Sequence, residues 1–387
     1  MNKIAILAAS FAVFGGAFAA APVVKVVGHG SEKVTVTLEC AGSPEFAKIL
    51  GRNLEISGHF QLGPSGAIKV TGAPGGVKAV GMGKAVSYDE PADTPAKARM
   101  VARQFADEMV KAYVPGGKGF ATSRICFVNR KGANNAELYT CYPDGFDIRQ
   151  ITNDGLAAVG PRWAPNGKDV YYTGFLHGVQ QIYRIDADTG AKTMLGSFKD
   201  GSTGCAVAPD GRRCAIVLAY QGNPELYVMP LGQRNAVVNR MTNTHGAAES
   251  SPCWSPDGSK IAYVSDETRN PQIYICDVAS RKSRRFTATG RQNTHPDWNS
   301  DGRLVWTSLR NGQWVVMVAD VSAGEKSARA VTSPGTWQDP SWAADGRHVV
   351  VARDNALFIV DTDPESDGKP TQIFYNQGRW MNPAASR

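Results

Sequence analysis

The sequence predicts a mostly β protein in which a six-bladed β-propeller follows a small α/β domain. A strand–turn–strand motif, clearest over Pro252 to Val264, recurs around Trp163, Val207, Trp298 and Trp342 at a spacing of 44 to 47 residues. The turns contain Asp-Gly or Asn-Gly, and apolar runs follow them, as in a tight β-turn that leads into a strand. The 41 glycines and 22 prolines also favour β structure. Short strands repeated at this period are typical of propeller blades.

Residues 1–21 have the pattern of an export signal. A short basic start at Lys3 precedes an apolar run from Ile4 to Phe18, and Ala17 to Ala19 offers small residues for cleavage. The apolar run is short for a membrane span, and no later segment could cross a bilayer as a helix. The mature protein is therefore expected to be exported and soluble, in the periplasm if the cell has two membranes.

Residues 22–115 predict the small α/β domain. An alternating strand over Val34 to Leu38 precedes a helix that begins at Ser43-Pro44, where serine fits an N-cap and proline the first turn. Short strand-like pieces follow in a glycine-rich stretch. A second helix begins at Thr94-Pro95 and ends before Pro115-Gly116-Gly117, which is expected to serve as a linker.

Residues 118–387 predict the propeller, closed by its C-terminal strand. The first blade begins at Arg124 without a copy of the leading strand, and Trp380 to Ala385 aligns with Trp337 to Trp342. The C-terminal segment should therefore supply the missing inner strand and close the ring, which removes the two exposed edges that an open array of blades would carry. The blades are expected at 118–155 with 379–387, then 156–199, 200–244, 245–290, 291–334 and 335–378. The repeated tryptophans are interpreted as packing between blades, in preference to forming a ligand platform.

The seven cysteines permit disulfides in an oxidising compartment and leave at least one thiol unpaired. Cys126 and Cys141 lie on two strands of an expected hairpin and face each other in a symmetric register, which makes a bridge possible. Cys205 and Cys214 flank the turn at Pro209 but are offset by two positions, which disfavours a bridge there. No Cys-x-x-Cys spacing indicates a metal site.

No catalytic residue, cofactor site or metal site is predicted. The net charge of +7 is spread over scattered lysines and arginines, without a nucleic-acid recognition module. The sequence contains no Gly-x-Ser-x-Gly nucleophile elbow. The stretch Asp361 to Gly368 does not match a calcium loop, because its glycine is misplaced and Gln372 stands where a glutamate is needed. The six histidines are isolated; His295, at a predicted channel mouth, is interpreted as a hydrogen-bonding residue.

These motifs resemble the TolB family of periplasmic propeller proteins, which belong to the Tol–Pal envelope system. The resemblance is carried by Trp-Ser-Pro-Asp-Gly at Trp254, by Gln-Ile-Tyr at Gln272 and by Arg-Phe-Thr at Arg285, and by the order of signal, α/β domain and propeller. It implies a non-enzymatic interaction protein, expected as a monomer, that supports envelope integrity and cell division. Two alternatives stay open: a propeller hydrolase or lyase, and a glycan or small-ligand binder that uses the channel.

The resemblance also implies two partner sites. The propeller face is expected to bind a Pal-like peptidoglycan-associated lipoprotein through polar residues just ahead of the inner strands, although these could instead only cap the strand ends. Those residues are Asp200, Ser202, Glu249, Ser250, Ser251, Asn293, Thr294, His295, Gln338 and Asp339. The segment Ala20 to Gly30 is expected to dock as an extended strand on a TolA-like inner-membrane protein.

Overall fold

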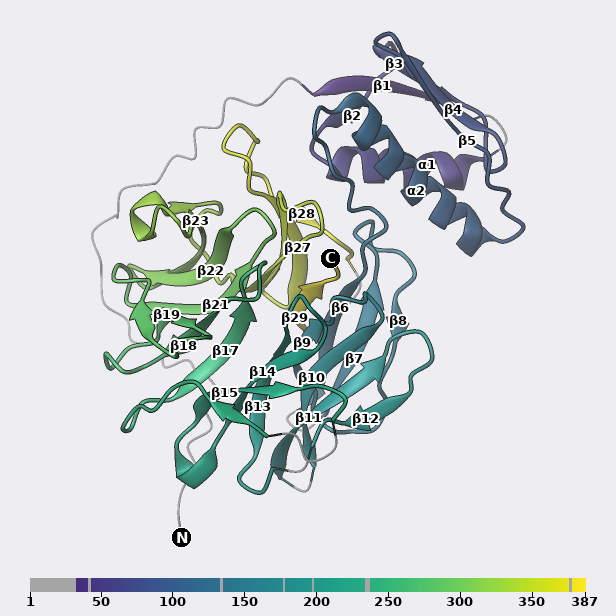
Figure 1. Ribbon diagram of the computed structural model, residues 1–387. Helices are drawn as coiled ribbons and strands as arrows, with labels where there is room; N and C mark the ends of the chain where they lie inside the picture. The colour runs from purple at the N-terminus through teal and green to yellow at the C-terminus, as the bar shows by residue number, and fades with distance from the viewer. Residues whose placement is uncertain are drawn as a thin grey trace.

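The computed structural model describes residues 33–40, 43–132, 135–176, 178–196, 198–233, 237–375 and 378–387 (Figure 1). The predicted export signal and the predicted docking segment at residues 20–30 lie outside these residues. Within the described ranges, no helix is both long and apolar enough to cross a membrane.

A five-stranded sheet and two helices form the α/β domain, as the sequence predicts (Figure 1). The elements are β1 (Val34–Glu39), α1 (Pro44–Ile56), β2 (Phe60–Leu62), β3 (Ile68–Thr71), β4 (Val77–Gly81), β5 (Lys84–Tyr88) and α2 (Pro95–Tyr113). The strand order is β2-β1-β3-β4-β5; β1 runs parallel to both neighbours, and the remaining pairs are antiparallel.

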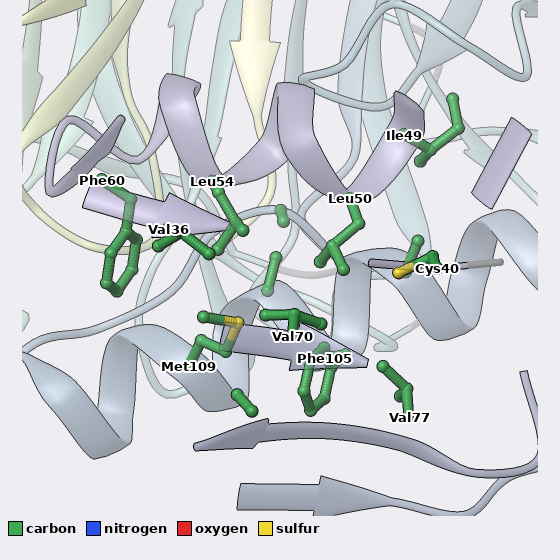
Figure 2. Packing of buried hydrophobic residues seen from close by; sticks show 14 of the residues in the cluster. Val36, Cys40, Ile49, Leu50, Leu54, Phe60, Val70, Val77, Phe105 and Met109 are labelled. Atoms are coloured by element: carbon green, nitrogen blue, oxygen red, sulfur yellow. The ribbon is translucent and has the colours of Figure 1, made fainter. Parts of the chain in front are cut away.

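The apolar faces of α1 and α2 meet the sheet in one core (Figure 2). Leu50 and Leu54 from α1, Phe105 and Met109 from α2, and Val70 from β3 are fully buried there. Burying a side chain of this size contributes about 1.5–3 kcal/mol relative to leaving it in water. This core gives the domain a hydrophobic interior separate from those of the blades.

The two helices begin where the sequence predicts, but only one makes a side-chain cap. Thr94 Oγ1 accepts a hydrogen bond from the Lys97 backbone N–H at 3.3 Å. Ser43 occupies the equivalent position before α1, yet its hydroxyl makes no capping hydrogen bond. Proline at the first helical position fixes φ for both helices.

Six four-stranded antiparallel sheets form the propeller, which confirms the predicted fold class. Blade 1 holds β29 (Trp380–Ala385), β6 (Ile125–Gly132), β7 (Asn135–Cys141) and β8 (Arg149–Gln150); blade 2 holds β9 (Val159–Trp163), β10 (Asp169–Leu176), β11 (Val179–Asp186) and β12 (Lys192–Met194). Blade 3 holds β13 (Ser202–Val207), β14 (Arg213–Leu218), β15 (Glu225–Pro230) and β16 (Asn239–Arg240); blade 4 holds β17 (Glu249–Trp254), β18 (Lys260–Ser265), β19 (Gln272–Asp277) and β20 (Ser283–Arg285). Blade 5 holds β21 (Gln292–Trp298), β22 (Arg303–Arg310), β23 (Gln313–Asp320) and β24 (Arg329–Ala330); blade 6 holds β25 (Gln338–Trp342), β26 (His348–Arg353), β27 (Ala356–Asp361) and β28 (Thr371–Gln372). Two short 3-10 turns, Tyr220–Gly222 and Glu325–Ser327, interrupt the connections.

The C-terminal strand closes the ring as predicted. Strand β29 pairs antiparallel with β6, with Met381 opposite Val128 and Ala385 opposite Ile125. Strand β29 also contacts the neighbouring inner strands β25 and β9. The first blade is therefore built from both ends of the propeller sequence, and β6 has a partner strand on each side.

Three of the repeated tryptophans, Trp163, Trp254 and Trp342, tie their blade to the one before it. Trp254 donates its indole N–H to the Ala206 carbonyl at 2.8 Å, and the Arg213 guanidinium lies over its ring at 4.9 Å. Trp342 repeats the pattern, with the Asp297 carbonyl at 3.1 Å and Arg303 at 5.2 Å. Each lock combines a hydrogen bond with a cation–π contact. The interpretation of these side chains as inter-blade packing is confirmed.

The possible Cys126–Cys141 disulfide is wrong. Cys126 and Cys141 are unbridged, and the register pairs Cys126 with Thr140 and Cys141 with Ile125. A register shift between Arg130 and Gly132 moves the pairing by one residue. Because side chains alternate along a strand, that shift sends the two cysteines to opposite faces of blade 1, into different cores.

Buried ionic contacts hold the α/β domain on the first blade. The Arg103 guanidinium, 0% exposed, donates from Nε to Asp144 Oδ2 at 2.7 Å and from Nη2 to Asp144 Oδ1 at 3.1 Å. Its Nη1 reaches Asp147 Oδ2 at 2.8 Å. From α1, Arg52 donates to the carbonyls of Asp144 and Ile373, both at 2.7 Å. The domain is thus attached to the loop between β7 and β8 and to the end of blade 6.

Candidate functional site at the mouth of the channel

Every inner strand contains a bulge near its first residues. The pairing of each inner strand with its neighbour shifts register at this point. One residue per bulge has left-handed backbone angles, with φ between 47° and 58°: Gly160, Gly204, Ser251, His295, Asp339 and Asn382. Proline follows five of the six, and Cys205 follows Gly204. Bulges re-aim side chains, so the blades place six equivalent positions around the axis, which we call the bulge ring.

The bulge ring is polar on one half and bare on the other. His295 Nε2 lies 3.0 Å from Asp339 Oδ1, and Asn382 Nδ2 donates to Asp339 Oδ2 at 2.6 Å. These contacts link three neighbouring blades through their side chains. On the other half, Gly160 and Gly204 carry no side chain, and a Cβ added at Gly160 would meet nothing within 4 Å. The backbone at Gly160 is therefore open to an approaching group, whereas a Cβ at Gly204 would lie 3.1 Å from Pro252 Cδ.

The structure divides the ten predicted partner residues by their exposure. Asp200, Ser250 and Gln338 are exposed, and Ser251, Thr294 and His295 are half-buried. Ser202, Glu249, Asn293 and Asp339 are buried. All except Asp200 lie within the first residues of β13, β17, β21 and β25. The sequence predicted these residues just ahead of the strands, so the strands begin slightly earlier than expected.

Asn293 and Glu249 belong to buried hydrogen-bond networks, Asp339 bonds to neighbouring blades, and Ser202 Oγ has no hydrogen-bond partner among the described residues. Asn293 Nδ2 donates to Gln272 Oε1 at 2.8 Å, and Asn293 Oδ1 accepts from the Trp306 indole at 2.8 Å. Thr287 Oγ1 donates to the same Gln272 oxygen at 2.8 Å and accepts the Ile273 N–H at 2.9 Å. Satisfied buried networks of this kind make the local structure rigid. Asn293 thereby fixes the strand from which Thr294 and His295 reach the mouth.

Glu249 performs the equivalent role in blade 4 as a neutral acid. Its oxygens accept from Thr244 Oγ1 at 3.2 Å and from Ser265 Oγ at 3.0 Å. Burial, reinforced by the negative charge of Glu225, raises the pKa of Glu249 to about 8. At neutral pH this carboxyl is mostly protonated, so it adds little charge to the mouth.

The opposite end of the inner strands encloses a cavity of about 290 Å³, lined by Trp163, Trp254 and Trp298 among others. Asp297 lies in it, 3.5 Å from Arg162 Nη1 and paired with Arg387 Nη2. Burial alone would raise the pKa of this carboxyl, but the charges of Arg387 and Arg162 hold it below the ordinary value. Asp297 also accepts the Trp342 N–H at 2.8 Å, so this charged cluster joins the C-terminus to blades 2, 5 and 6.

Sequence reasoning missed Asn382, Arg162, Asp297 and Arg387. The sequence did contain a signal for Asn382, because the alignment of Trp380 to Ala385 with Trp337 to Trp342 makes Asn382 equivalent to Asp339. The other three carried no signal, since they meet only when the ring closes. In the part of the chain that the structure covers, no group of three or more His, Cys, Asp or Glu side chains could hold a metal ion.

Comparison with known proteins decides the family. The family model described as the TolB beta propeller domain matches residues 113–387. The chain belongs to the TolB propeller family. A "Protein TolB homolog" of Chlorobium chlorochromatii (strain CaD3) is 31% identical over 184 residues, which is 48% of this chain and 40% of the relative. The match therefore spans less than half of that TolB homolog's length.

Solved TolB structures share the fold. The crystal structure of TolB from Acinetobacter baumannii has a TM-score of 0.80 at 22% identity, and the match covers 93% of this chain and 98% of that one. A putative TolB from Agrobacterium tumefaciens gives a TM-score of 0.54 at 19% identity over 68% of this chain and 96% of that one. The Acinetobacter match extends over both the α/β domain and the propeller.

Proposed function

We propose that the protein is a non-catalytic periplasmic component of a Tol–Pal envelope system that supports outer-membrane integrity and cell division. In this proposal the bulge ring binds a peptidoglycan-associated lipoprotein, and the N-terminal region contacts a TolA-like inner-membrane protein. The observation that carries the proposal is the bulge ring itself. Six blades present one equivalent position each, and three of them form the linked chain His295–Asp339–Asn382.

The ten proposed residues divide into contacts and supports. Ser250, Ser251, Thr294, His295 and Gln338 have accessible side chains and would meet the lipoprotein. The buried Ser202, Glu249, Asn293 and Asp339 would hold those side chains in position. Asp200, exposed in the loop before β13, would contact the partner at the rim.

The bare half of the bulge ring gives the partner access to backbone. At Gly160 no Cβ screens the peptide group and no other atom lies within 4 Å of the Cβ position, so a loop of the lipoprotein could approach closely there. Short polar side chains on the other half would set its orientation through hydrogen bonds. Such a surface favours a folded protein partner with a protruding polar loop.

The binding proposal is tested by titrating the purified exported chain with the soluble domain of the lipoprotein from the same genome. The variant S250R/Q338R places two long cations at exposed positions of the mouth and should weaken Kd at least tenfold, about 1.4 kcal/mol. The matched control is S300R, an exposed serine in the turn after β21, at the other end of the inner strand. Equal binding by wild type and S250R/Q338R, or no binding by any form, would contradict the proposal.

The N-terminal contact is tested separately. Full-length mature chain and a chain lacking residues 22–32 are compared for capture of the TolA-like protein. We expect the shortened chain to lose that partner and to keep the lipoprotein. If the shortened chain still captures the TolA-like protein, the contact does not involve residues 22–32 and this part of the proposal is wrong.

A further inference from the structure

The third blade departs from the repeat at two positions, and both hold cysteine. Two residues before the end of the inner strand, the other blades carry proline, whereas β13 carries Cys205. The prolines are Pro161, Pro252, Pro296, Pro340 and Pro383. At the second position of the next strand, blades 2, 4, 5 and 6 carry Val170, Ile261, Leu304 and Val349. Strand β14 carries Cys214 there and β6 of blade 1 carries Cys126, but only blade 3 has cysteine at both positions.

The two sulfur atoms of these cysteines touch. Cys214 pairs with Val207, and Cys205 lies two residues from Val207 on the same face of the sheet. The offset of two positions expected from the sequence is therefore present, yet the Sγ atoms lie only 2.6 Å apart. Diagonal neighbours on an antiparallel pair are within reach of each other, and the bulge at Gly204 increases the local twist. The offset does not keep the thiols apart.

The other two pairs of cysteines that share a blade do not have this arrangement. Cys253 and Cys276 of blade 4 belong to different cores, as Cys126 and Cys141 of blade 1 do. Cys205 and Cys214 lie in one core, exposed by only 3% and 0%. Their contact is specific to the blade in which the repeat is broken.

We propose that Cys205 and Cys214 are joined by a disulfide in the exported protein. Each thiol gives up one proton and one electron, a bond forms between the two sulfur atoms, and the two electrons reduce a disulfide-bearing oxidant to its dithiol by thiol–disulfide exchange. The inference rests on the expected export to an oxidising compartment. It is independent of the proposed partners.

The location determines when the bond forms. Burial raises the pKa of the Cys205 thiol well above its ordinary value, and only the thiolate attacks a disulfide. The folded blade therefore excludes the reaction, and oxidation takes place before blade 3 closes. Once folded, the bridge is out of reach of solvent reductants. It links β13 to β14 across the turn at Asp210-Gly211, in the blade where Val207 replaces the tryptophan that four of the other inner strands carry.

The experiment uses full-length chain produced with an export leader and isolated from the oxidising compartment without reductant. The protein is unfolded, free thiols are blocked with iodoacetamide, and the chain is then reduced and labelled with N-ethylmaleimide. Trypsin separates the two cysteines, because Arg212 and Arg213 lie between them. We expect maleimide on Cys205 and Cys214, iodoacetamide on the other five cysteines, and a linked peptide in the unreduced digest.

A second measurement tests whether a disulfide is the reason that Cys205 and Cys214 escape iodoacetamide. Reductant present during unfolding should lower the melting temperature of wild type by several degrees and leave C205A/C214V unchanged. The control variant C253A keeps both cysteines and should respond to reductant as wild type does. Iodoacetamide on both Cys205 and Cys214 in the exported protein would overturn the proposal, as would an equal response of wild type and C205A/C214V to reductant.

Discussion

Replacing Arg103 with methionine should separate the α/β domain from the propeller. The Arg103 and Asp144 side chains are both 0% exposed and share two hydrogen bonds, at 2.7 and 3.1 Å. Methionine fills similar space but leaves the Asp144 carboxylate buried without its cation. A buried charge that loses its partner is far more costly than an exposed one.

The loss works out at about 3 kcal/mol. Breaking a buried pair from one side costs about 3–5 kcal/mol. Asp144 keeps two neutral donors, Asn53 Nδ2 at 3.1 Å and the Phe146 N–H at 3.0 Å, which favours the lower end of that range. With a urea m-value of roughly 1–3 kcal/mol/M, the midpoint of the affected transition should fall by about 1–3 M.

Two optical probes can follow the two domains separately. All eight tryptophans lie at or beyond Trp163, so indole fluorescence reports the propeller. Both α-helices in the described part of the chain belong to the α/β domain, so helical circular dichroism reports that domain. R103M should shift the dichroism transition to lower urea and the fluorescence transition less.

Two further variants check the cause of the R103M effect. R99M removes a half-buried arginine that also pairs with Asp147 and should lose about 1 kcal/mol or less. R103M/D144L removes both charges and should recover part of the loss. Equal shifts of both transitions in R103M, or a loss in R99M as large as in R103M, would refute the reasoning.

Three other predictions concern the propeller. Deleting residues 379–387 should lower the urea midpoint of the fluorescence transition severely, because β6 loses its partner strand; an unchanged midpoint would contradict ring closure. W254F should lower the free energy of unfolding in urea by about 1–3 kcal/mol, because the Ala206 carbonyl loses its hydrogen-bond donor. W298F should lower it less, since the Trp298 indole N–H has no partner among the described residues. Equal losses of stability in the two variants would refute the inter-blade lock. Glu249 has a folded pKa of about 8 against an ordinary 4.5, so the native state binds more protons between these values and stability should fall as pH rises across that window. Urea midpoints for E249Q should fall less over the same window; parallel curves for wild type and E249Q would exclude Glu249 as the cause.

The sequence could predict the blades because their information is local and repeated. Turn residues and alternating apolar runs recur at a near-constant spacing, and the alignment of Trp380 with Trp337 was sufficient to predict ring closure. The α/β domain followed from helix starts at Pro44 and Pro95. The strand Lys84–Tyr88 was not predicted, since it has no strongly alternating apolar pattern.

The remaining features depend on single-residue register shifts that no periodic pattern shows. One such shift at Arg130–Gly132 turned Cys126 and Cys141 away from each other. Others moved Glu249 and Asn293 into the blades while their neighbours Ser250 and Thr294 stayed accessible. A bulge reverses the side of the sheet that a residue faces, so exposure near a bulge cannot be predicted from alternation.

The left-handed backbone of the bulge ring limits which amino acids the channel mouth can use. Positive φ is costly for β-branched and bulky side chains but is tolerated by glycine, and asparagine, aspartate and histidine are enriched there. Five of the six positions hold residues of this set, namely Gly160, Gly204, His295, Asp339 and Asn382, and the sixth holds the small Ser251. Substitutions among these residue types can therefore change the hydrogen-bonding groups that one blade presents at the mouth, while the backbone hydrogen bonds between the strands stay intact. At these six positions this chain can offer a partner backbone groups and short polar side chains, because the left-handed backbone disfavours bulky apolar residues there.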